Sequence, residues 1–177
     1  MAINNLLLNG GFEDGNLDNW SATNTTISDH SHTGNFSARF RCIGSASLSQ
    51  TVPISNGRNY QLLISLAKSG ILPAPSLVLR VTFLNEVDMV VGNGTQVNIP
   101  ANNLPNVFFN TWHHVYQITE DAPPEATQAK VQILKFDPNN SFYSSVLIDD
   151  VQLLDFEASG TMPPGPTGPT GPTGANF

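Results

Sequence analysis

The chain has 177 residues, and the roughly 160 residues before a C-terminal glycine repeat are enough for one domain with its own hydrophobic core. Charged residues make up only 12% of the sequence, and 7 Lys and Arg residues stand against 14 Asp and Glu residues, which gives a net charge of −7. Because no cluster of basic residues stands out, the sequence argues against nucleic acid and against an anionic membrane as partners.

Short runs rich in Val, Ile, Leu, Phe and Thr alternate with Gly and Pro along the chain, a pattern typical of strands separated by turns. Apolar residues at every second position, as in SLVLRVTFLN, indicate strands with one buried face. The absence of strand–helix alternation predicts an all-β fold, an antiparallel two-sheet jelly-roll sandwich. The predicted strands lie near residues 3–8, 36–43, 46–53, 58–68, 76–85, 87–92, 112–119, 127–136 and 145–154.

The segment 93–111 is predicted to be the longest irregular stretch, and irregular loops of this length are usually functional or packed on themselves. It carries four large apolar side chains, which either cover the end of the sandwich or form an interface with another chain. These candidate interface residues are Leu104, Val107, Phe108 and Phe109.

Cys42 is the only cysteine, so an internal disulfide is impossible, and we expect a small apolar residue buried in a strand. A link between chains is the alternative interpretation. The N-terminus lacks the basic start and the long apolar run of a signal peptide. No stretch approaches the roughly 18 apolar residues that a membrane-spanning helix needs.

The C-terminus reads PPGPTGPTGPTGANF, in which glycine recurs every third residue, the period of a collagen triple helix. We therefore expect a head domain over residues 1–157, a linker over 158–164 and a collagen-like Gly-Pro-Thr tail over 165–177. A single chain supplies only one strand of a triple helix, so the tail predicts a homotrimer. The residues that define the tail are Gly165, Gly168, Gly171 and Gly174.

Two motifs at the ends of the head resemble the first and last strands of jelly-roll carbohydrate-binding modules: NLLLNGGFEDGNLDNW at 5–20 and SVLIDDVQLL at 145–154. Together with SLAKSGILPAP, NLPNV, NTWHHVYQ and the Gly-Pro-Thr triplets, the chain resembles the N-terminal domain of collagen-like exosporium proteins of spore-forming bacilli. The triplet run is shorter than in such proteins, since Phe177 stands where the next glycine would fall.

This resemblance implies a location on the spore surface, the exosporium, which a protein reaches without a signal peptide when the mother cell lyses. Reducing conditions during synthesis agree with the single cysteine. The resemblance also implies possible O-glycosylation at the solvent-facing positions of the triplets. These positions are Thr167, Thr170 and Thr173.

Glu13, Asp149 and Asp150 are the candidate metal ligands. In the carbohydrate-binding modules that the sequence resembles, a structural Ca²⁺ lies where the opening and closing strands meet, and carbonyls of the loop 29–34 would complete its oxygen ligands. The alternative is that these acids only accept hydrogen bonds from backbone N–H groups.

The four histidines do not match the spacing of a zinc site, and we expect them to be solvated or packed. His113 and His114 should point to opposite faces of a strand. Five aromatic residues could stack on a sugar, although both tryptophans are expected in the core, and four asparagines could bind hydroxyl groups. These residues are Trp20, Trp112, Tyr60, Tyr116 and Tyr143, with Asn98, Asn102, Asn103 and Asn106.

No motif for nucleophilic catalysis is present, and the adjacent Asp149 and Asp150 should diverge on a strand rather than flank a cleft, so we expect no enzyme. The sequence best fits a structural protein of the spore surface, in which the head trimerises or docks onto other spore-surface proteins and presents the stalk. The alternative is a carbohydrate-binding module with a collagen-like tail, whose partners would be glycans.

Overall fold

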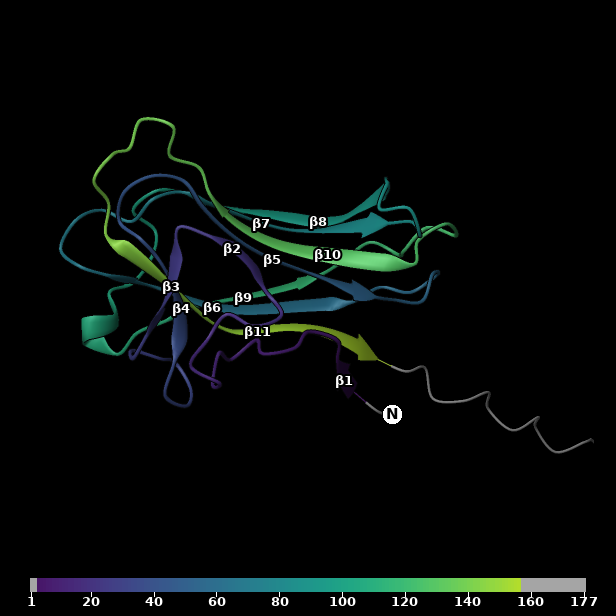
Figure 1. Cartoon of the computed structure of the whole chain (residues 1–177), viewed down its shortest axis with the longest axis horizontal. Coiled ribbons are helices and arrows are strands. Elements are labelled where there is room, and N and C mark those ends of the chain that lie inside the picture. The colour runs from purple at the N-terminus through teal and green to yellow at the C-terminus, as the bar shows by residue number, and fades with distance from the viewer. Residues whose placement is uncertain (1–2, 157–177) are drawn as a thin grey trace, which may run out of the picture.

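The computed structural model describes residues 3–156, which form two antiparallel β-sheets packed face to face (Figure 1). The expected all-β sandwich is confirmed. The linker 158–164 and the tail 165–177, with its glycines and threonines, lie outside the described residues.

The first sheet has six strands in the order β3-β4-β11-β6-β9, with β1 paired to β11. Its strands are β1 (Ile3–Asn5), β3 (Thr25–Ser28), β4 (Ser37–Phe40), β6 (Gln61–Ser69), β9 (His113–Ile118) and β11 (Ser145–Phe156). β11 lies at the centre of this sheet, because it pairs with β1, β4 and β6.

The second sheet has five strands in the order β2-β5-β10-β7-β8. Its strands are β2 (Ser21–Thr23), β5 (Ala46–Pro53), β7 (Leu77–Leu84), β8 (Val90–Ile99) and β10 (Gln128–Lys135), and one short 3-10 helix, η1 (Val107–Phe109), follows β8. β10 pairs with β5 on one side and β7 on the other along its whole length, so it forms the middle of this sheet.

The hydrophobic core lies between the two sheets. The alternating residues Leu77, Leu79, Val81 and Phe83 of β7 face inward, as the period of two predicts, and join the inward residues of β6 and β11 in one buried cluster. The opposite positions of β7 are only partly buried, whereas Ala67 of β6 and Leu147 of β11 are covered on the outer face of the first sheet by Val107 and Trp112. The second sheet therefore has an outer face that is free to carry a binding site.

Residues 93–99 belong to β8, so the prediction of an irregular segment from residue 93 was wrong at its start. Gly92 and Gly94 both lie in the strand, at points where neighbouring groups come close. A Cβ at Gly92 would stand 2.7 Å from a ring carbon of Pro123, and one at Gly94 would stand 3.1 Å from the Phe83 ring. These glycines thus permit close packing instead of ending the strand.

The structure corrects the prediction for Cys42 and adds two short strands. Cys42 is exposed in the loop after β4, because β4 ends at Phe40, so it is not buried in a strand. The short strands β2 and β3 were not predicted; they have three and four residues in a segment rich in Ser, Thr and Asn. A turn lies at Asn56-Gly57, with Gly57 at φ +69°.

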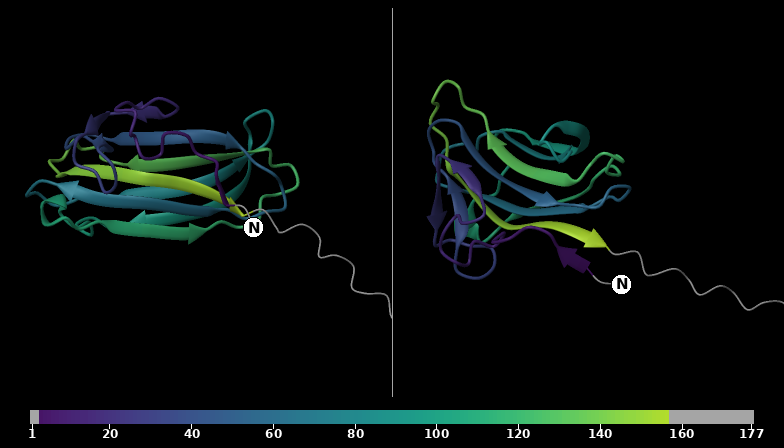
Figure 2. Two further views of the ribbon diagram at one scale, coloured as in Figure 1. Left: turned by 90° about the horizontal axis from the view of Figure 1, so that it is seen from below. Right: turned by 45° about the vertical axis from the view of Figure 1, so that its right-hand side comes forward.

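Four loops gather at one end of the sandwich, the end opposite β1 and the last residues of β11 (Figures 1 and 2). They follow β4, β6, β8 and β10, and hydrogen bonds join them: Tyr143 donates to the Cys42 carbonyl and Ser144 to that of Pro73. We call this the apolar end. Its exposed apolar side chains are Ile43, Ile71, Leu72, Phe108, Phe109, Phe136 and Phe142.

Candidate functional site

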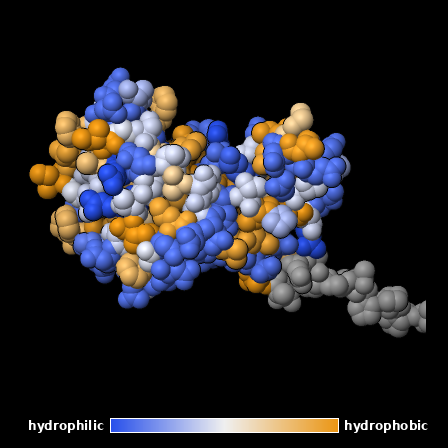
Figure 3. Space-filling model, viewed as in Figure 1, coloured by the Kyte–Doolittle hydropathy of each residue, from blue (hydrophilic) through white to orange (hydrophobic). Residues whose placement is uncertain are grey.

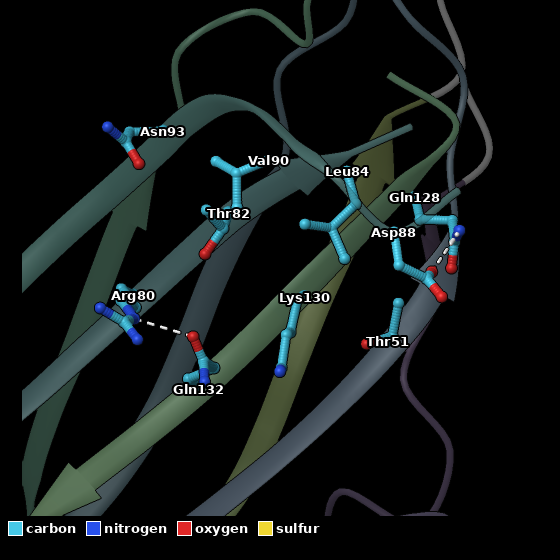
Figure 4. Close-up of a pocket in the computed structure, with 10 residues that line it drawn as sticks. All are labelled: Thr51, Arg80, Thr82, Leu84, Asp88, Val90, Asn93, Gln128, Lys130 and Gln132. Atoms are coloured by element: carbon cyan, nitrogen blue, oxygen red, sulfur yellow. Dashed lines mark hydrogen bonds between the residues drawn. The ribbon is translucent and has the colours of Figure 1, made fainter. Parts of the chain in front are cut away.

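A hollow of about 710 Å³ opens on the outer face of the five-stranded sheet (Figure 4). We call it the polar groove, because eight of its ten lining side chains are polar. The lining residues are Thr51, Arg80, Thr82, Leu84, Asp88, Val90, Asn93, Gln128, Lys130 and Gln132. They come from β5, β7, β8 and β10 and from the turn between β7 and β8.

Strand alternation places these side chains on one face. In β10, Ala129, Val131 and Ile133 are buried in the core, so Gln128, Lys130 and Gln132 project outward between them. The same alternation in β7 turns Arg80 and Thr82 outward. The sequence shows this pattern of polar residues, but not that the two strands are neighbours.

The antiparallel register sets which side chains of the polar groove are opposite each other. Gln132 pairs with Arg80, and the Arg80 Nε donates a hydrogen bond of 2.8 Å to the Gln132 side-chain oxygen. Lys130 lies between Thr82 on β7 and Thr51 on β5. Arg80 and Lys130 are therefore diagonal neighbours on one face of the sheet, where long side chains come within reach of each other.

Asp88 is the only carboxylate that lines the polar groove, and it lies at one end. Gln128 donates from its side-chain nitrogen to an Asp88 oxygen at 3.1 Å and to the Asn85 carbonyl at 3.1 Å. The groove lining thus lacks the pair of carboxylates that flank a sugar in most glycoside hydrolases.

Two further hollows share Arg80 with the polar groove. One runs along β8 toward β9 and is lined by Thr95, Gln96 and Gln117 among others. The other is lined by Ser47, Leu134 and the exposed Phe136 near the apolar end. Arg80 therefore borders all three of these hollows.

The predicted metal ligand Glu13 holds a loop in place. Both of its carboxylate oxygens accept hydrogen bonds from the Asn35 backbone N–H at 2.9 Å, and one also accepts from the Phe36 N–H at 3.0 Å. These N–H groups of Phe36 and Asn35 hold the pKa of Glu13 below its usual value. Gly34 at φ +65° leaves room for the carboxylate, since a Cβ there would overlap it.

Asp149 holds the same loop from the last strand. It is fully buried, and it accepts hydrogen bonds from the backbone N–H groups of His32 at 2.8 Å, Thr33 at 3.2 Å and Asp150 at 2.7 Å. Burial raises the pKa of Asp149 to about 6. The structure thus brings Glu13 and Asp149 to one loop, as the sequence predicts.

Asp150 lies at a bulge of β11 with φ +50° and turns to the outer face of the first sheet. Its carboxylate contacts the His32 ring nitrogen Nδ1 at 2.5 Å and accepts a hydrogen bond from the Thr33 hydroxyl at 2.5 Å. Asp149 and Asp150 diverge, as expected, but they hold neighbouring residues of the same loop.

In this arrangement the carboxylates of the three acids bond to groups of the protein itself. The oxygens of Glu13 and Asp149 face backbone N–H groups, whose positive hydrogens occupy the directions from which a cation would approach. Within residues 3–156, no group of three or more His, Cys, Asp or Glu residues is arranged to hold a metal. The geometry resembles the alternative that the sequence left open, in which these acids bond to N–H groups. Calcium binding remains an untested prediction.

His32 and His114 lie together, which the sequence did not indicate because 82 residues separate them. Their rings are 4.7 Å apart, the His32 ring is 5.6 Å from the Trp112 ring, and the His114 Nδ1 is 3.1 Å from the Ser65 hydroxyl. They line a hollow of about 520 Å³ on the outer face of the first sheet, beside the exposed Tyr116.

The candidate sugar-stacking aromatics are mostly unavailable. Trp20 and Trp112 are each 8% exposed, and Tyr60 is fully buried. Trp20 belongs to the main core, whereas Trp112 packs in a separate buried cluster with Ala67, Val107 and Leu147. Tyr143 is half-buried, with the Lys135 ammonium 5.7 Å from its ring centre. Tyr116 is exposed, but it lies on β9 of the first sheet.

The four candidate asparagines do not form one site. Asn98 projects from β8 on the outer face of the second sheet, whereas Asn102 and Asn103 lie in the loop that follows. Asn106 has a structural role, because its side chain donates to the Gly70 carbonyl at 2.8 Å and caps η1.

The four candidate interface residues also separate. Leu104 and Val107 are buried beneath the loop, and Phe108 and Phe109 are 64% and 80% exposed at the apolar end. Only the two phenylalanines therefore remain accessible to another chain.

No family model and no curated protein matches this sequence. Within residues 3–156, no helix is long and apolar enough to cross a membrane. Solved structures do match. The chain is similar to the enzymatically active domain of tailspike protein 4 of bacteriophage CBA120, with a TM-score of 0.67 and 18% identity over 84% of this chain, but it spans only 21% of that chain.

Two carbohydrate-binding modules match over nearly their whole length. The module TmCBM61, solved in complex with β-1,4-galactotriose, has a TM-score of 0.58 and 17% identity, over 85% of this chain and 97% of that chain. A family 16 carbohydrate-binding module has a TM-score of 0.64 and 14% identity, over 85% and 100%. The expected likeness to jelly-roll carbohydrate-binding modules is confirmed, and at these identities it concerns the fold alone.

Proposed function

We propose that the head domain binds a polysaccharide in the polar groove. The observation that carries this proposal is a row of outward polar side chains whose hydrogen-bonding capacity is largely unused. Within the described residues, Thr51, Thr82, Asn93 and Lys130 have no side-chain hydrogen bond, although all line one groove. Sugar hydroxyl groups both donate and accept hydrogen bonds, so such a surface is complementary to them.

The likeness of the fold to carbohydrate-binding modules supports this proposal, which was the alternative reading of the sequence. The hollow at His32 and Tyr116 is the competing site, because it contains an exposed aromatic ring. Its polar groups already bond to one another: Asp150 to His32 and Thr33, and Ser65 to His114. They leave fewer free donors and acceptors for a ligand than the polar groove does.

The polar groove contains no aromatic ring among its lining residues, so hydrogen bonds must supply most of the binding energy. Each such bond contributes only about 0.5–1.5 kcal/mol net, since water is displaced on both sides. We therefore expect weak binding of single sugars and stronger binding of oligosaccharides that contact several strands.

Calorimetric titration of the head with a panel of soluble polysaccharides tests the proposal. Gln132→Ala should weaken binding of any positive ligand, because it removes an amide at the centre of the groove and frees Arg80. The matched control is Gln152→Ala, which removes the same half-buried side chain from the first sheet. Loss of binding in the control alone would place the binding site on the outer face of the first sheet.

We keep a structural role on the bacterial spore surface as a second candidate, in which the non-enzymatic head docks onto other spore-surface proteins, or trimerises, and presents a collagen-like stalk. The apolar end favours it, because all exposed phenylalanines among residues 3–156 lie in its loops. Figure 3 shows hydrophobic side chains on the surface at this end, on the left of the view. Phe156, the last described residue, lies at the opposite end (Figure 1). Docking through the apolar end would therefore direct the chain that follows β11 away from the docking surface.

Light scattering distinguishes trimerisation of the head from docking onto other proteins. A homotrimer of the full chain that persists in residues 1–157 would place the interface in the head. A monomer in both forms would contradict trimerisation and leave docking to other proteins.

A further inference from the structure

We propose that the ligand of the polar groove is an acidic polysaccharide, whose negative group binds between Arg80 and Lys130. This inference rests on the proposed function and specifies the class of its ligand. The carriers of the charge would be carboxylates of uronic acid residues or, with the same chemistry, sulfate groups.

The first argument is the juxtaposition of two cations. The register places Lys130 opposite Thr82 and Gln132 opposite Arg80. The two cationic side chains are therefore diagonal neighbours on adjacent strands (Figure 4). Like charges in such positions repel each other. Within residues 3–156 neither cation has a carboxylate within 4.0 Å, so no described acid offsets this repulsion.

The second argument is the free donor capacity. Gln132 occupies the Nε of Arg80 and holds the guanidinium in place, while the described residues leave both terminal nitrogens of that group without a hydrogen bond. Those two nitrogens form a fork that matches a carboxylate or sulfate. Lys130 can add its own ammonium hydrogens to the same anion.

The third argument is the contrast with the rest of the molecule. The chain carries a net charge of −7, yet two of its seven cations lie together in this groove. Of the others, Arg58 pairs with Asp155, and Lys68 and Lys135 donate to backbone carbonyls. Arg39 and Arg41 line none of the four hollows described above. Among the described residues, Arg80 and Lys130 are thus the two cations that share one hollow without an ion pair or a hydrogen bond to a backbone carbonyl.

Asp88 limits where the anion can lie. It accepts a hydrogen bond from Gln128, which pairs with Leu84 of β7. Arg80 and Gln132 pair with each other on the opposite side of Lys130. A negative group is therefore attracted to the Arg80 side of Lys130 and repelled from the Asp88 end. This polarity gives the groove a preferred orientation for an asymmetric chain.

Polygalacturonate oligomers and their fully methyl-esterified form test the proposal, because the two probes share a backbone and differ in charge. Titration of the full chain should show binding of the acid form, at least tenfold weaker binding of the ester, and weaker binding of the acid as salt rises. Dextran sulfate against dextran repeats the comparison for sulfate. Binding of either acidic probe in preference to its neutral partner supports the proposal.

Arg80→Gln and Lys130→Gln should each weaken binding of the acidic probe about tenfold, the usual effect of losing one charge-assisted hydrogen bond. The matched control is Arg39→Gln, an exposed arginine of β4 on the other sheet, which should leave binding unchanged. Circular dichroism of each variant checks that it folds.

The outcomes separate this inference from the proposed function. Equal affinity of each acidic probe and its neutral partner in both comparisons, or unchanged binding of the acidic probe in both groove variants, would overturn the acidic ligand. If neutral polysaccharides still bound and Gln132→Ala still weakened their binding, the proposed function would stand without the inference of an acidic ligand. If no polysaccharide of either kind bound, both would fall.

Discussion

Asp149 shows how one buried carboxylate connects the last strand to a distant loop. Three backbone N–H groups donate to it, and its fully buried position makes the ionised form costly. The net result is a pKa raised to about 6, so Asp149 changes its protonation in a range where most carboxylates stay ionised.

The protein should accordingly become more stable as pH falls from 7 to about 5. A carboxyl whose pKa is higher in the folded state than in the unfolded state binds its proton more tightly when folded, so acidification favours folding in this window. Below about pH 4.5 the trend should reverse, because Glu13 and Asp137, whose pKa values are lowered, then protonate. Urea denaturation at several pH values measures both slopes.

Asp149→Asn should remove the slope between pH 7 and 5, since the titrating group is gone. Glu13→Gln is the control and should keep it, because Glu13 titrates at lower pH. A slope that persists in Asp149→Asn would show that another group causes it.

Gly10 and Gly11 offer a second test at the scale of single residues. A Cβ at Gly10 would stand 2.0 Å from the Val151 carbonyl oxygen, while one at Gly11 would have only a side-chain carbon of Glu13 nearby, at 3.8 Å. Gly10→Ala should therefore cost about 1–3 kcal/mol of unfolding free energy or more, because the backbone must shift. Gly11→Ala should be close to neutral. Equal effects in thermal denaturation would contradict this packing.

At this scale the sequence predicted some contacts and missed others. The association of Glu13 with Asp149 followed from motifs that mark the opening and closing strands. The His32–His114 contact could not be predicted, because it depends on how a loop folds over the outer face of a sheet. The exposure of Cys42 was missed because β4 ends at Phe40, three residues before the end of the strand predicted at 36–43.

At the scale of elements, the regular strands were the most predictable. β5, β7, β10 and β11 alternate apolar and polar residues or lie in long apolar runs, and each was predicted to within two residues. β8 was not predicted to this accuracy, because glycines are typical of turns. The glycines of β8 are needed where Phe83 and Pro123 pack closely against the strand, which the sequence does not show.

The polar groove belongs to this scale as well. Each strand shows its outward polar residues in the sequence, but the strand order β5-β10-β7-β8 pairs residues that are far apart in the chain, such as Ala46 with Lys135. The cation pair of Arg80 and Lys130 therefore exists only through the register of β7 and β10. A search for clustered charges along the chain cannot find it.

At the scale of the whole molecule, the apolar end and the end of β11 lie far apart (Figure 1). Three chains that enter a common stalk must bring their β11 ends together, so an interface at the apolar end would hold them at a distance. If the head trimerises, contacts along the sides of the sandwich are better placed for this purpose.

Phe108→Ser combined with Phe109→Ser tests this placement. Both side chains are exposed, so the double variant should melt at the same temperature as the wild type and have the same mass by light scattering. It should bind less to any protein that docks at the apolar end. Dissociation of a trimer into monomers would instead put the interface on the 104–109 loop.

The central claim is that a polysaccharide binds to the outer face of the five-stranded sheet. An NMR titration of the isotope-labelled head with the best-binding oligosaccharide tests it most directly, because each backbone amide reports separately. The account predicts that the shifted amides cluster on β5, β7, β8 and β10 around Arg80 and Lys130. Shifts centred on His32, His114 and Tyr116 of the opposite sheet, or no shifts with any acidic or neutral oligosaccharide, would contradict it.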